Sequence, residues 1–258
     1  MNNPDEGKRL ALQVNPRSFV EKYLLSYLND SSNILDIGCG PGVIASEIAN
    51  FFPFSKIYCI DAIYDRILEV LQKKDKNNKI FGAVSNIYSL PFESNKFDFI
   101  YSRFLFEYLK HPDKAVNEII RLCSPGGRIW LQDIDGQLHW FYPEENPLSL
   151  KIQKISTYLN QATGFDPFIG RKLYHLLYSK GVKNINVKAE IHELSWGKKD
   201  DSFINKWKNK FDITYPIITK ALNNSNEAHN LIKECIEFFK REDTMVYSVL
   251  FTVTGIKE

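Results

Sequence analysis

The sequence has little cysteine and no cysteine pair with the spacing of a metal site. Its four cysteines, Cys39, Cys59, Cys123 and Cys235, are scattered, and none forms a Cys-x-x-Cys motif. This spacing argues against a disulfide framework and against a cysteine-based zinc site. No cluster of acidic residues has the pattern of a metal site either. We therefore expect reduced, structural thiols and no bound metal.

An excess of one charge and a long apolar run are also missing. The 258 residues carry 33 basic and 31 acidic side chains, a formal net charge of +2, which excludes a strongly basic nucleic-acid or membrane binder. No stretch approaches the roughly 18 consecutive apolar residues that span a bilayer, and the segment 1–9 is polar. With 44% hydrophobic and 25% charged residues, the chain is predicted to be an ordinary globular protein. We expect it in the cytoplasm, without nucleic-acid or membrane partners.

Strands and helices alternate along the first half of the chain. A short apolar strand at 33–37 is followed by a glycine-rich turn and by helical spacing at Ile44, Ala45 and Ile48. A second strand is expected at 57–60 and a helix at 62–73. Further strands are expected at 79–84, 97–101 and 128–133, and a helix follows the fourth strand to about Cys123. This order predicts a parallel sheet with crossover helices.

The second half of the chain completes the sheet. A helical stretch begins at Asp166 and ends at Gly181, an alternating strand is expected at 185–191, and the last strand at 245–254. The residues between these two strands contain helical patterns. With a helix at 16–28, we expect an α/β fold: a doubly wound, mostly parallel seven-stranded sheet with N-terminal helices and a helical insertion before the last strand. One domain, 1–258, would comprise an N-terminal helical lid (1–30), a cofactor-binding half (31–135) and an insertion that covers the substrate (198–243).

The residues that end the first strand indicate a ligand site, because open parallel sheets bind ligands beyond the carboxyl ends of their strands. Gly38, Gly40 and Gly42 lack a Cβ, so the backbone can turn sharply and lie against a ligand. Their spacing is GxGxG, whereas a dinucleotide site has GxGxxG. Asp36 ends the strand, where it would repel a pyrophosphate. This carboxylate suits a cationic group of the ligand instead.

A second acid, Asp61, ends the second strand, where it can accept hydrogen bonds from two ribose hydroxyls. The sequence resembles the class I S-adenosylmethionine-dependent methyltransferases in three places: the segment 34–42, Asp61, and Leu90-Pro91-Phe92 ahead of the segment 97–100. The resemblance extends from about Ser31 to Asp133. It is weaker from 164 to 191 and absent from 198 to 241.

The resemblance implies S-adenosylmethionine as the cofactor and S-adenosylhomocysteine as its product. Asp36 and the turn 38–42 would hold the methionine part, and Asp61 with Ala62 the ribose. The other implied cofactor-binding residues are Asn86 and Ile87 at the adenine, Ser102 and Arg103 near the methionine end and the substrate, and Arg9 or Gln13 at the ligand carboxylate. Asn86 stands where the family often has aspartate. An amide oxygen still accepts a hydrogen bond, and the amide NH2 can donate one.

The region after the fourth strand excludes several subclasses of the family. Residues 101–104 contain no Asn/Asp-Pro-Pro-Tyr/Phe stretch, as the amino-methylating DNA enzymes have, and Glu107 has no second glutamate at the spacing of the arginine methyltransferases. We therefore expect a metal-independent enzyme, monomeric or homodimeric, that transfers a methyl group to an O, N or C nucleophile of a small molecule by in-line displacement.

This reaction needs positioning and exclusion of water more than a fixed catalytic residue. If the acceptor must lose a proton, His139, Asp133 and Tyr108 are candidate general bases by their place in the sequence. The run 139–142 is expected just after the fifth strand, where its aromatic rings would either hold an apolar substrate or pack the insertion onto the sheet.

Three alternatives remain open at this point. A protein of the same fold can use S-adenosylmethionine for a reaction other than methyl transfer. It can also bind the cofactor without catalysis and present a surface to a partner. A nicotinamide dehydrogenase is disfavoured by the GxGxG spacing and by Asp36.

Overall fold

The structure, a computed structural model, describes residues 14–73 and 79–258. The N-terminal helical segment consists of α2 (Pro16–Phe19), a π turn (Val20–Leu24) and a 3-10 turn (Leu25–Tyr27). The strands are β1 (Asn33–Ile37), β2 (Lys56–Asp61), β3 (Lys79–Val84), β4 (Phe97–Arg103), β5 (Cys123–Tyr142), β6 (Lys183–Trp196) and β7 (Met245–Ile256). The other helices are α3 (Val43–Phe51), α4 (Tyr64–Gln72), α5 (Pro112–Leu122), α6 (Asn146–Thr163), α7 (Leu173–Tyr178), α8 (Asp201–Leu222) and α9 (Ser225–Lys240).

The strands form one seven-stranded sheet in the order β3-β2-β1-β4-β5-β7-β6. The five strands from β3 to β5 pair in parallel, and β7 runs antiparallel to both β5 and β6. The chain crosses back between β1 and β4, so the strand order reverses there, which is where open sheets bind ligands. The predicted fold class is confirmed, including the N-terminal helices and the helical insertion between β6 and β7.

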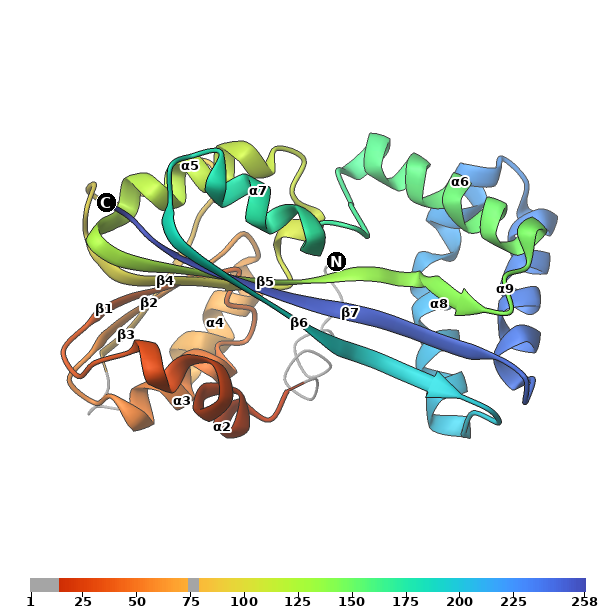
Figure 1. The fold of residues 1–258 in the computed structure, drawn as a ribbon, viewed down its shortest axis with the longest axis horizontal. Helices are drawn as coiled ribbons and strands as arrows, with labels where there is room; N and C mark the ends of the chain where they lie inside the picture. The colour runs from red at the N-terminus through yellow and green to blue at the C-terminus, as the bar shows by residue number, and fades with distance from the viewer. Residues whose placement is uncertain (1–13, 74–78) are drawn as a thin grey trace.

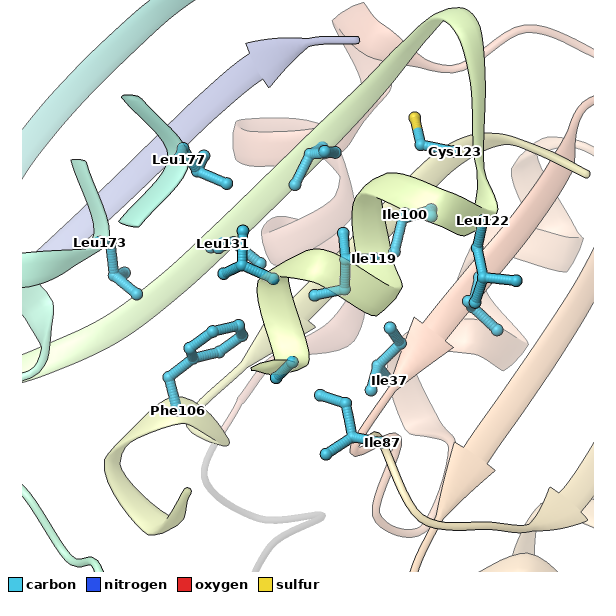
Figure 2. Close-up of a cluster of buried hydrophobic side chains, with 14 of the residues drawn as sticks. Ile37, Ile87, Ile100, Phe106, Ile119, Leu122, Cys123, Leu131, Leu173 and Leu177 are labelled. Carbon is cyan, nitrogen blue, oxygen red and sulfur yellow. The ribbon is translucent and has the colours of Figure 1, made fainter. Parts of the chain in front are cut away.

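Helices cover both faces of the parallel part of the sheet (Figure 1), with α5 and α7 on one face and α2, α3 and α4 on the other. Each face has its own buried apolar cluster. In Figure 2, Ile119 and Leu122 of α5 lie over Ile37, Ile100 and Leu131 of the sheet. The strand residues are buried because parallel strands are packed on both faces.

The ends of β5, β7 and β6 extend beyond the parallel sheet and carry α6, α8 and α9 (Figure 1). We call these three helices with the strand ends the helical lobe. Its own apolar cluster includes Trp207 and Phe211 of α8, Phe239 of α9 and Ile152 of α6. Asp200 and Asn224 cap α8 and α9 by accepting backbone N–H groups of the first turn. Because β5 runs parallel to β4 and continues past it into the lobe, the lobe lies beyond the carboxyl ends of the parallel strands.

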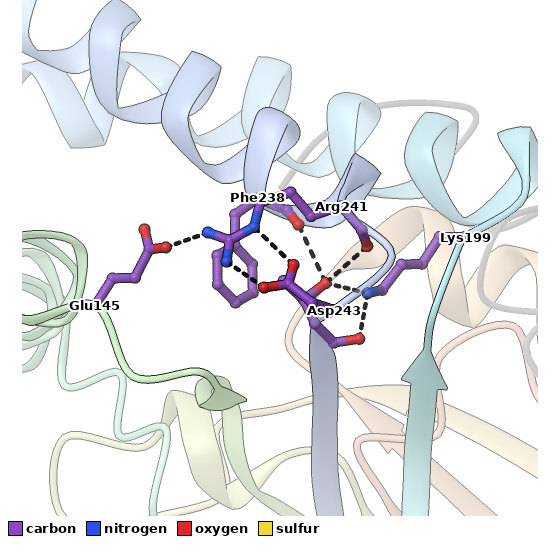
Figure 3. A network of polar contacts seen from close by, with 6 residues as sticks. Glu145, Lys199, Phe238, Arg241 and Asp243 are labelled. Carbon is purple, nitrogen blue, oxygen red and sulfur yellow. Dashed lines mark hydrogen bonds and ion pairs between the residues drawn. The ribbon is translucent and has the colours of Figure 1, made fainter.

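A polar network holds the loops of the lobe together (Figure 3). Arg241, between α9 and β7, pairs with Glu145 ahead of α6 and with Asp243, to which its Nη2 donates at 2.7 Å. Lys199, between β6 and α8, is buried and donates from Nζ to the carbonyl oxygen of Thr244 at 2.7 Å. The network ties the entries of α6 and α8 to the start of β7.

Two features differ from the sequence-based expectation. The fifth strand extends to Tyr142, so the prediction that residues 139–142 follow the strand is wrong: Trp140 to Tyr142 pair with β7, opposite Tyr247 to Met245. The interruption at Gly136 and Leu138, which both have positive φ, conceals this continuation in the sequence. Helix α6 was not expected at all.

Within the described residues, we find no helix that combines the length and the apolar character needed to cross a membrane.

Candidate functional site

The glycine turn joins β1 to α3 in a backbone shape that suits glycine. Gly38, Gly40 and Gly42 have φ angles of 72°, 52° and 70°, which L side chains rarely adopt. The backbone N–H of Gly38 donates to the carbonyl oxygen of Ile60 at 2.8 Å, which fixes the turn to the end of β2. A Cβ on Gly42 would lie 2.7 Å from Cγ2 of Val70. The turn thus directs the N-terminus of α3 and its amides toward the carboxyl edge of the sheet.

Asp61 is held next to this turn. Its Oδ2 accepts the backbone N–H of Gly40 at 3.0 Å, and its Oδ1 accepts that of Ile63 at 2.9 Å. Each carboxylate oxygen has two lone pairs, so both can accept one more hydrogen bond from a ligand. Ala62 lies beside it and is exposed. The structure therefore places Asp61 and Ala62 at the same edge as the glycines.

Asp36 is the buried acid of the site, with 4% of its surface exposed. Its Oδ2 accepts the Tyr101 hydroxyl at 2.6 Å. Burial raises the pKa of Asp36 to about 7, although the hydrogen bond from Tyr101 opposes this shift. A cationic ligand group nearby would favour the ionised form. Tyr101, from the neighbouring strand β4, is a site residue that sequence reasoning missed, since only the β1–β4 register brings it opposite Asp36.

Asn86 and Ile87 follow β3 and occupy different surroundings. Asn86 is exposed, and its Oδ1 accepts the backbone N–H of Tyr88 at 3.0 Å, so its amide NH2 is the group with hydrogens to donate. The side chain of Ile87 is buried in the cluster under α5. Both residues lie one strand beyond Asp61, on the side away from β4.

Ser102 and Arg103 end β4, and their side chains make different contacts. Ser102 is buried, and its hydroxyl donates to the carbonyl oxygen of Ile37 at 2.9 Å, which ties β4 to β1. The Arg103 guanidinium lies 3.9 Å from the ring centroid of Phe104 and 5.3 Å from that of Phe19. Arg9 and Gln13, the other expected cofactor residues, lie outside the described residues.

The three candidate bases are not gathered at one point. Asp133 is buried, and its two oxygens accept the backbone N–H groups of Glu107 at 3.2 Å and of Ile134 at 2.9 Å. Burial raises the pKa of Asp133 to about 7. Tyr108, which follows Glu107 in the chain, is 43% exposed and contacts the ring of Phe165.

His139 lies further along β5 and belongs to the lobe contacts. Its Nε2 is 2.7 Å from the Ser156 hydroxyl on α6, and its ring contacts Phe168. Desolvation lowers the pKa of His139 to about 4. The imidazole is therefore neutral and already hydrogen-bonded at neutral pH.

Glu107 is a second buried acid beside Asp133, and the sequence did not single it out for catalysis. It is 5% exposed, and burial, with the charge of Asp133, raises its pKa well above the usual range. Two buried carboxyl groups side by side do not both ionise readily. No local pattern marks the pair, because it forms only when the turn after β4 packs on β5.

A hollow of about 480 Å³ lies where β6 passes into α8, lined by residues 192–195, 198–200 and Phe203. The His192 ring meets the Phe104 ring at a centroid distance of 5.5 Å, so the hollow adjoins the end of β4. Its volume is in the range of small-molecule sites.

Comparison with known proteins gives one family and several relatives. Residues 35–131 match the family model described as a methyltransferase domain. An uncharacterized methyltransferase of Schizosaccharomyces pombe is 30% identical over 159 residues, 58% of this chain and 56% of that protein. The chain spans about half the length of the curated relatives that it matches.

Two solved structures share the fold. A putative methyltransferase from Bacillus halodurans has a TM-score of 0.60 at 14% identity, covering 92% of this chain and 98% of that one. Phosphoethanolamine N-methyltransferase 2 of Haemonchus contortus, in complex with phosphomonomethylethanolamine and S-adenosylhomocysteine, has a TM-score of 0.58 at 16% identity, covering 94% of this chain and 52% of that one. At these identities the likeness concerns the fold alone.

Proposed function

We propose that this chain, whose residues 35–131 match the model of a methyltransferase domain, is a class I S-adenosylmethionine-dependent methyltransferase. It would transfer the methyl group of S-adenosylmethionine to an O, N or C nucleophile of a small molecule. The observation that carries the proposal is the contact between Asp61 and the glycine turn, 3.0 Å from Oδ2 to the Gly40 nitrogen. The contact holds a carboxylate beside a turn that lets a ligand lie against the backbone, and we propose that this carboxylate binds the ribose.

The residues of the site fit the chemistry of this cofactor. Asp36 is a buried carboxyl group that only a tyrosine hydroxyl partners among the described side chains, and a positive amino or sulfonium group would stabilise its ionised form. Asp61 has lone pairs for two ribose hydroxyls. Asn86 would donate its NH2 to the adenine, and the apolar Ile87, with Ala62 and Ser102 nearby, would border the rest of the ligand. Arg9 and Gln13 stay in the proposal as groups for the ligand carboxylate.

The bound cofactor would supply an already activated methyl group, so that one S–C bond breaks as the bond to the acceptor forms. The chain then has to position the acceptor and exclude water, which can lower the activation free energy by several kcal/mol. Where the acceptor must lose a proton, Asp133 suits this better than His139, because burial raises the pKa of Asp133 whereas desolvation lowers the pKa of His139 to about 4. Tyr108, the most exposed of the three, would contact the acceptor directly.

The helical lobe is proposed to cover the acceptor. The segment 198–243 supplies α8 and α9, which lie beyond the carboxyl ends of the parallel strands, and the segment 1–30 would close the other side. The residues 31–135 then form the cofactor-binding half of a single domain, 1–258. We further propose a cytoplasmic monomer or homodimer that acts on small molecules and not on nucleic acid.

The proposal is tested by methyl transfer. Purified protein is incubated with S-adenosylmethionine labelled in the methyl group and with a small-molecule extract freed of protein and nucleic acid. Label is expected in a small product with the wild type and is expected to fall at least tenfold with Asp61→Ala. Asp98→Ala is the matched control, because Asp98 is an exposed acid at the opposite end of β4 that accepts the Asn33 N–H at 2.8 Å. Equal label from both variants would contradict the proposed site.

A further inference from the structure

Arg103 is held in one orientation by apolar and polar contacts. Its guanidinium lies over the ring of Phe104, at 3.9 Å, with the ring of Phe19 at 5.3 Å. Its Nε donates to Oε1 of Gln132 at 3.3 Å. The amide nitrogen of Gln132 in turn donates to the Thr252 hydroxyl at 2.7 Å, so the amide oxygen is the atom that faces the arginine. Stacking and this hydrogen bond fix the plane of the guanidinium.

The two terminal nitrogens of Arg103 have no hydrogen bond and no ion pair with any residue of the described ranges 14–73 and 79–258. The charge of Asp133 acts on Arg103, but the two groups form no ion pair within 4.0 Å. Burial lowers the pKa of Arg103 to about 10, so the group remains charged at neutral pH. A largely buried cation without a carboxylate partner is costly unless a ligand compensates it.

Two lysines act on His192, the same histidine on which Arg103 acts. Lys206 and Lys210 lie on one side of α8, at positions i and i+4. The pKa of His192 is lowered to about 4, first by desolvation and then by the charges of Lys206, Arg103 and Lys210, against Glu193. Glu193 itself pairs with Lys206 at 2.6 Å. Lys210 and Arg103 therefore add positive charge on the side of the lobe that adjoins the end of β4, whereas the charge of Lys206 is balanced by Glu193.

We propose that Arg103 binds the anionic group of the methyl acceptor, a carboxylate or a phosphate, in a bidentate manner through its two terminal nitrogens. The planar guanidinium matches the geometry of both anions. The hollow of about 480 Å³ receives the rest of the acceptor, since the ring of Phe104 contacts both the guanidinium and His192, which lines the hollow. This inference rests on the proposed methyl transfer and adds the chemical class of the substrate. The same chemistry is present in the methionine carboxylate of the cofactor, so the test must separate the two sources.

The experiment titrates sodium butyrate and inorganic phosphate into the ¹⁵N-labelled full chain at low ionic strength. The backbone amide signals of Phe104 and Gln132 report binding. Each titration is made with the ligand-free protein, with protein saturated with S-adenosylhomocysteine, and with protein saturated with methylthioadenosine, which lacks the amino-acid carboxylate. Binding of S-adenosylhomocysteine is measured separately by calorimetry.

A saturable shift is expected in all three states, because the acceptor anion and the cofactor bind together. Arg103→Gln should abolish the shift and Arg103→Lys should weaken the affinity about tenfold, while the affinity for S-adenosylhomocysteine changes less than twofold. Arg128→Gln is the matched control: its guanidinium also stacks on a ring, that of Tyr27 at 4.7 Å, but at the opposite edge of the sheet. It should leave the shift unchanged.

Two results would overturn the inference. If S-adenosylhomocysteine removes the anion response and methylthioadenosine does not, Arg103 holds the methionine carboxylate. If Arg103→Gln retains the response, the anions bind elsewhere. A wild-type chain that binds no S-adenosylhomocysteine would instead refute the proposed function, and the ligand-free titration would still decide whether Arg103 is an anion site.

Discussion

Gly42 offers a direct test of the conformation that the site depends on. Substitution by alanine places a side chain at φ 70°, where an L residue costs about 1–2 kcal/mol. The new Cβ would also lie 2.7 Å from Cγ2 of Val70, and relieving such a contact in a packed interior costs about 1–3 kcal/mol. We therefore expect Gly42→Ala to lower the free energy of unfolding by about 2–5 kcal/mol.

Gly126 provides the matched control. Its φ of 77° is similar, but a Cβ there would meet nothing within 4 Å, so Gly126→Ala should show the backbone cost alone, about 1–2 kcal/mol. Urea unfolding at equilibrium measures both variants with the same slope m. In Gly42→Ala/Val70→Ala the contact is removed, so the two changes should be non-additive by about 1 kcal/mol or more. Equal losses for Gly42→Ala and Gly126→Ala, with additive behaviour of the double variant, would refute the reasoning.

Three other predictions follow from the burial and charge of single residues. The pKa of Asp36 is raised from 3.8 to about 7, so the contribution of this residue to stability is present at low pH and is lost as the pH rises from about 4 to 7. A cationic cofactor needs the ionised form of Asp36, so the affinity for the cofactor should fall up to tenfold per pH unit below about 7. Calorimetry should find this pH dependence missing in Asp36→Asn. Arg171→Ala would leave Asp135, which is 2% exposed, without its ion pair. This change should lower the free energy of unfolding in urea by about 2–3 kcal/mol, less than for a fully buried pair because the arginine is half exposed. A loss below about 0.5 kcal/mol would contradict this. Leu131→Ala, in the fully buried cluster of Figure 2, should cost about 2–5 kcal/mol in the same assay, and a near-neutral effect would count against the packing described.

The parallel half of the sheet could be predicted because its signals are local. The third strand was expected at 79–84 and is observed from Lys79 to Val84, since an apolar run between polar loops suffices to mark it. As the resemblance implied, residues 35–131 match the model of a methyltransferase domain. The resemblance depended on the glycines of the turn 38–42, whose type is dictated by backbone shape, and on Asp61, which accepts backbone N–H groups of Gly40 and Ile63.

The other features depend on contacts between distant segments. The extension of β5 to Tyr142 is stabilised by pairing with Met245 of β7, and the bend at Gly136 hides it from any search for alternation. Helix α6, in contrast, has a local signal in the spacing of Leu148, Ile152 and Ile155, so it could have been predicted.

The buried groups of the site were the least predictable. Glu107 meets Asp133, and Tyr101 meets Asp36, only through the packing of β4 against its neighbours. A sequence pattern records which face of a strand is apolar, but it does not record which polar group of a neighbouring strand lies opposite. The turn and its place at the end of β1 could thus be predicted, whereas the buried partners of the acids could not.

The central claim is that the glycine turn and Asp61 bind S-adenosylmethionine, and calorimetric titration of the full chain tests it most directly. We expect micromolar affinity for S-adenosylmethionine and S-adenosylhomocysteine and none for NAD, with binding lost in Asp61→Ala and in Gly38→Val and kept in Asp98→Ala. Binding of NAD alone, or affinity for S-adenosylmethionine that Asp61→Ala leaves unchanged, would contradict the account.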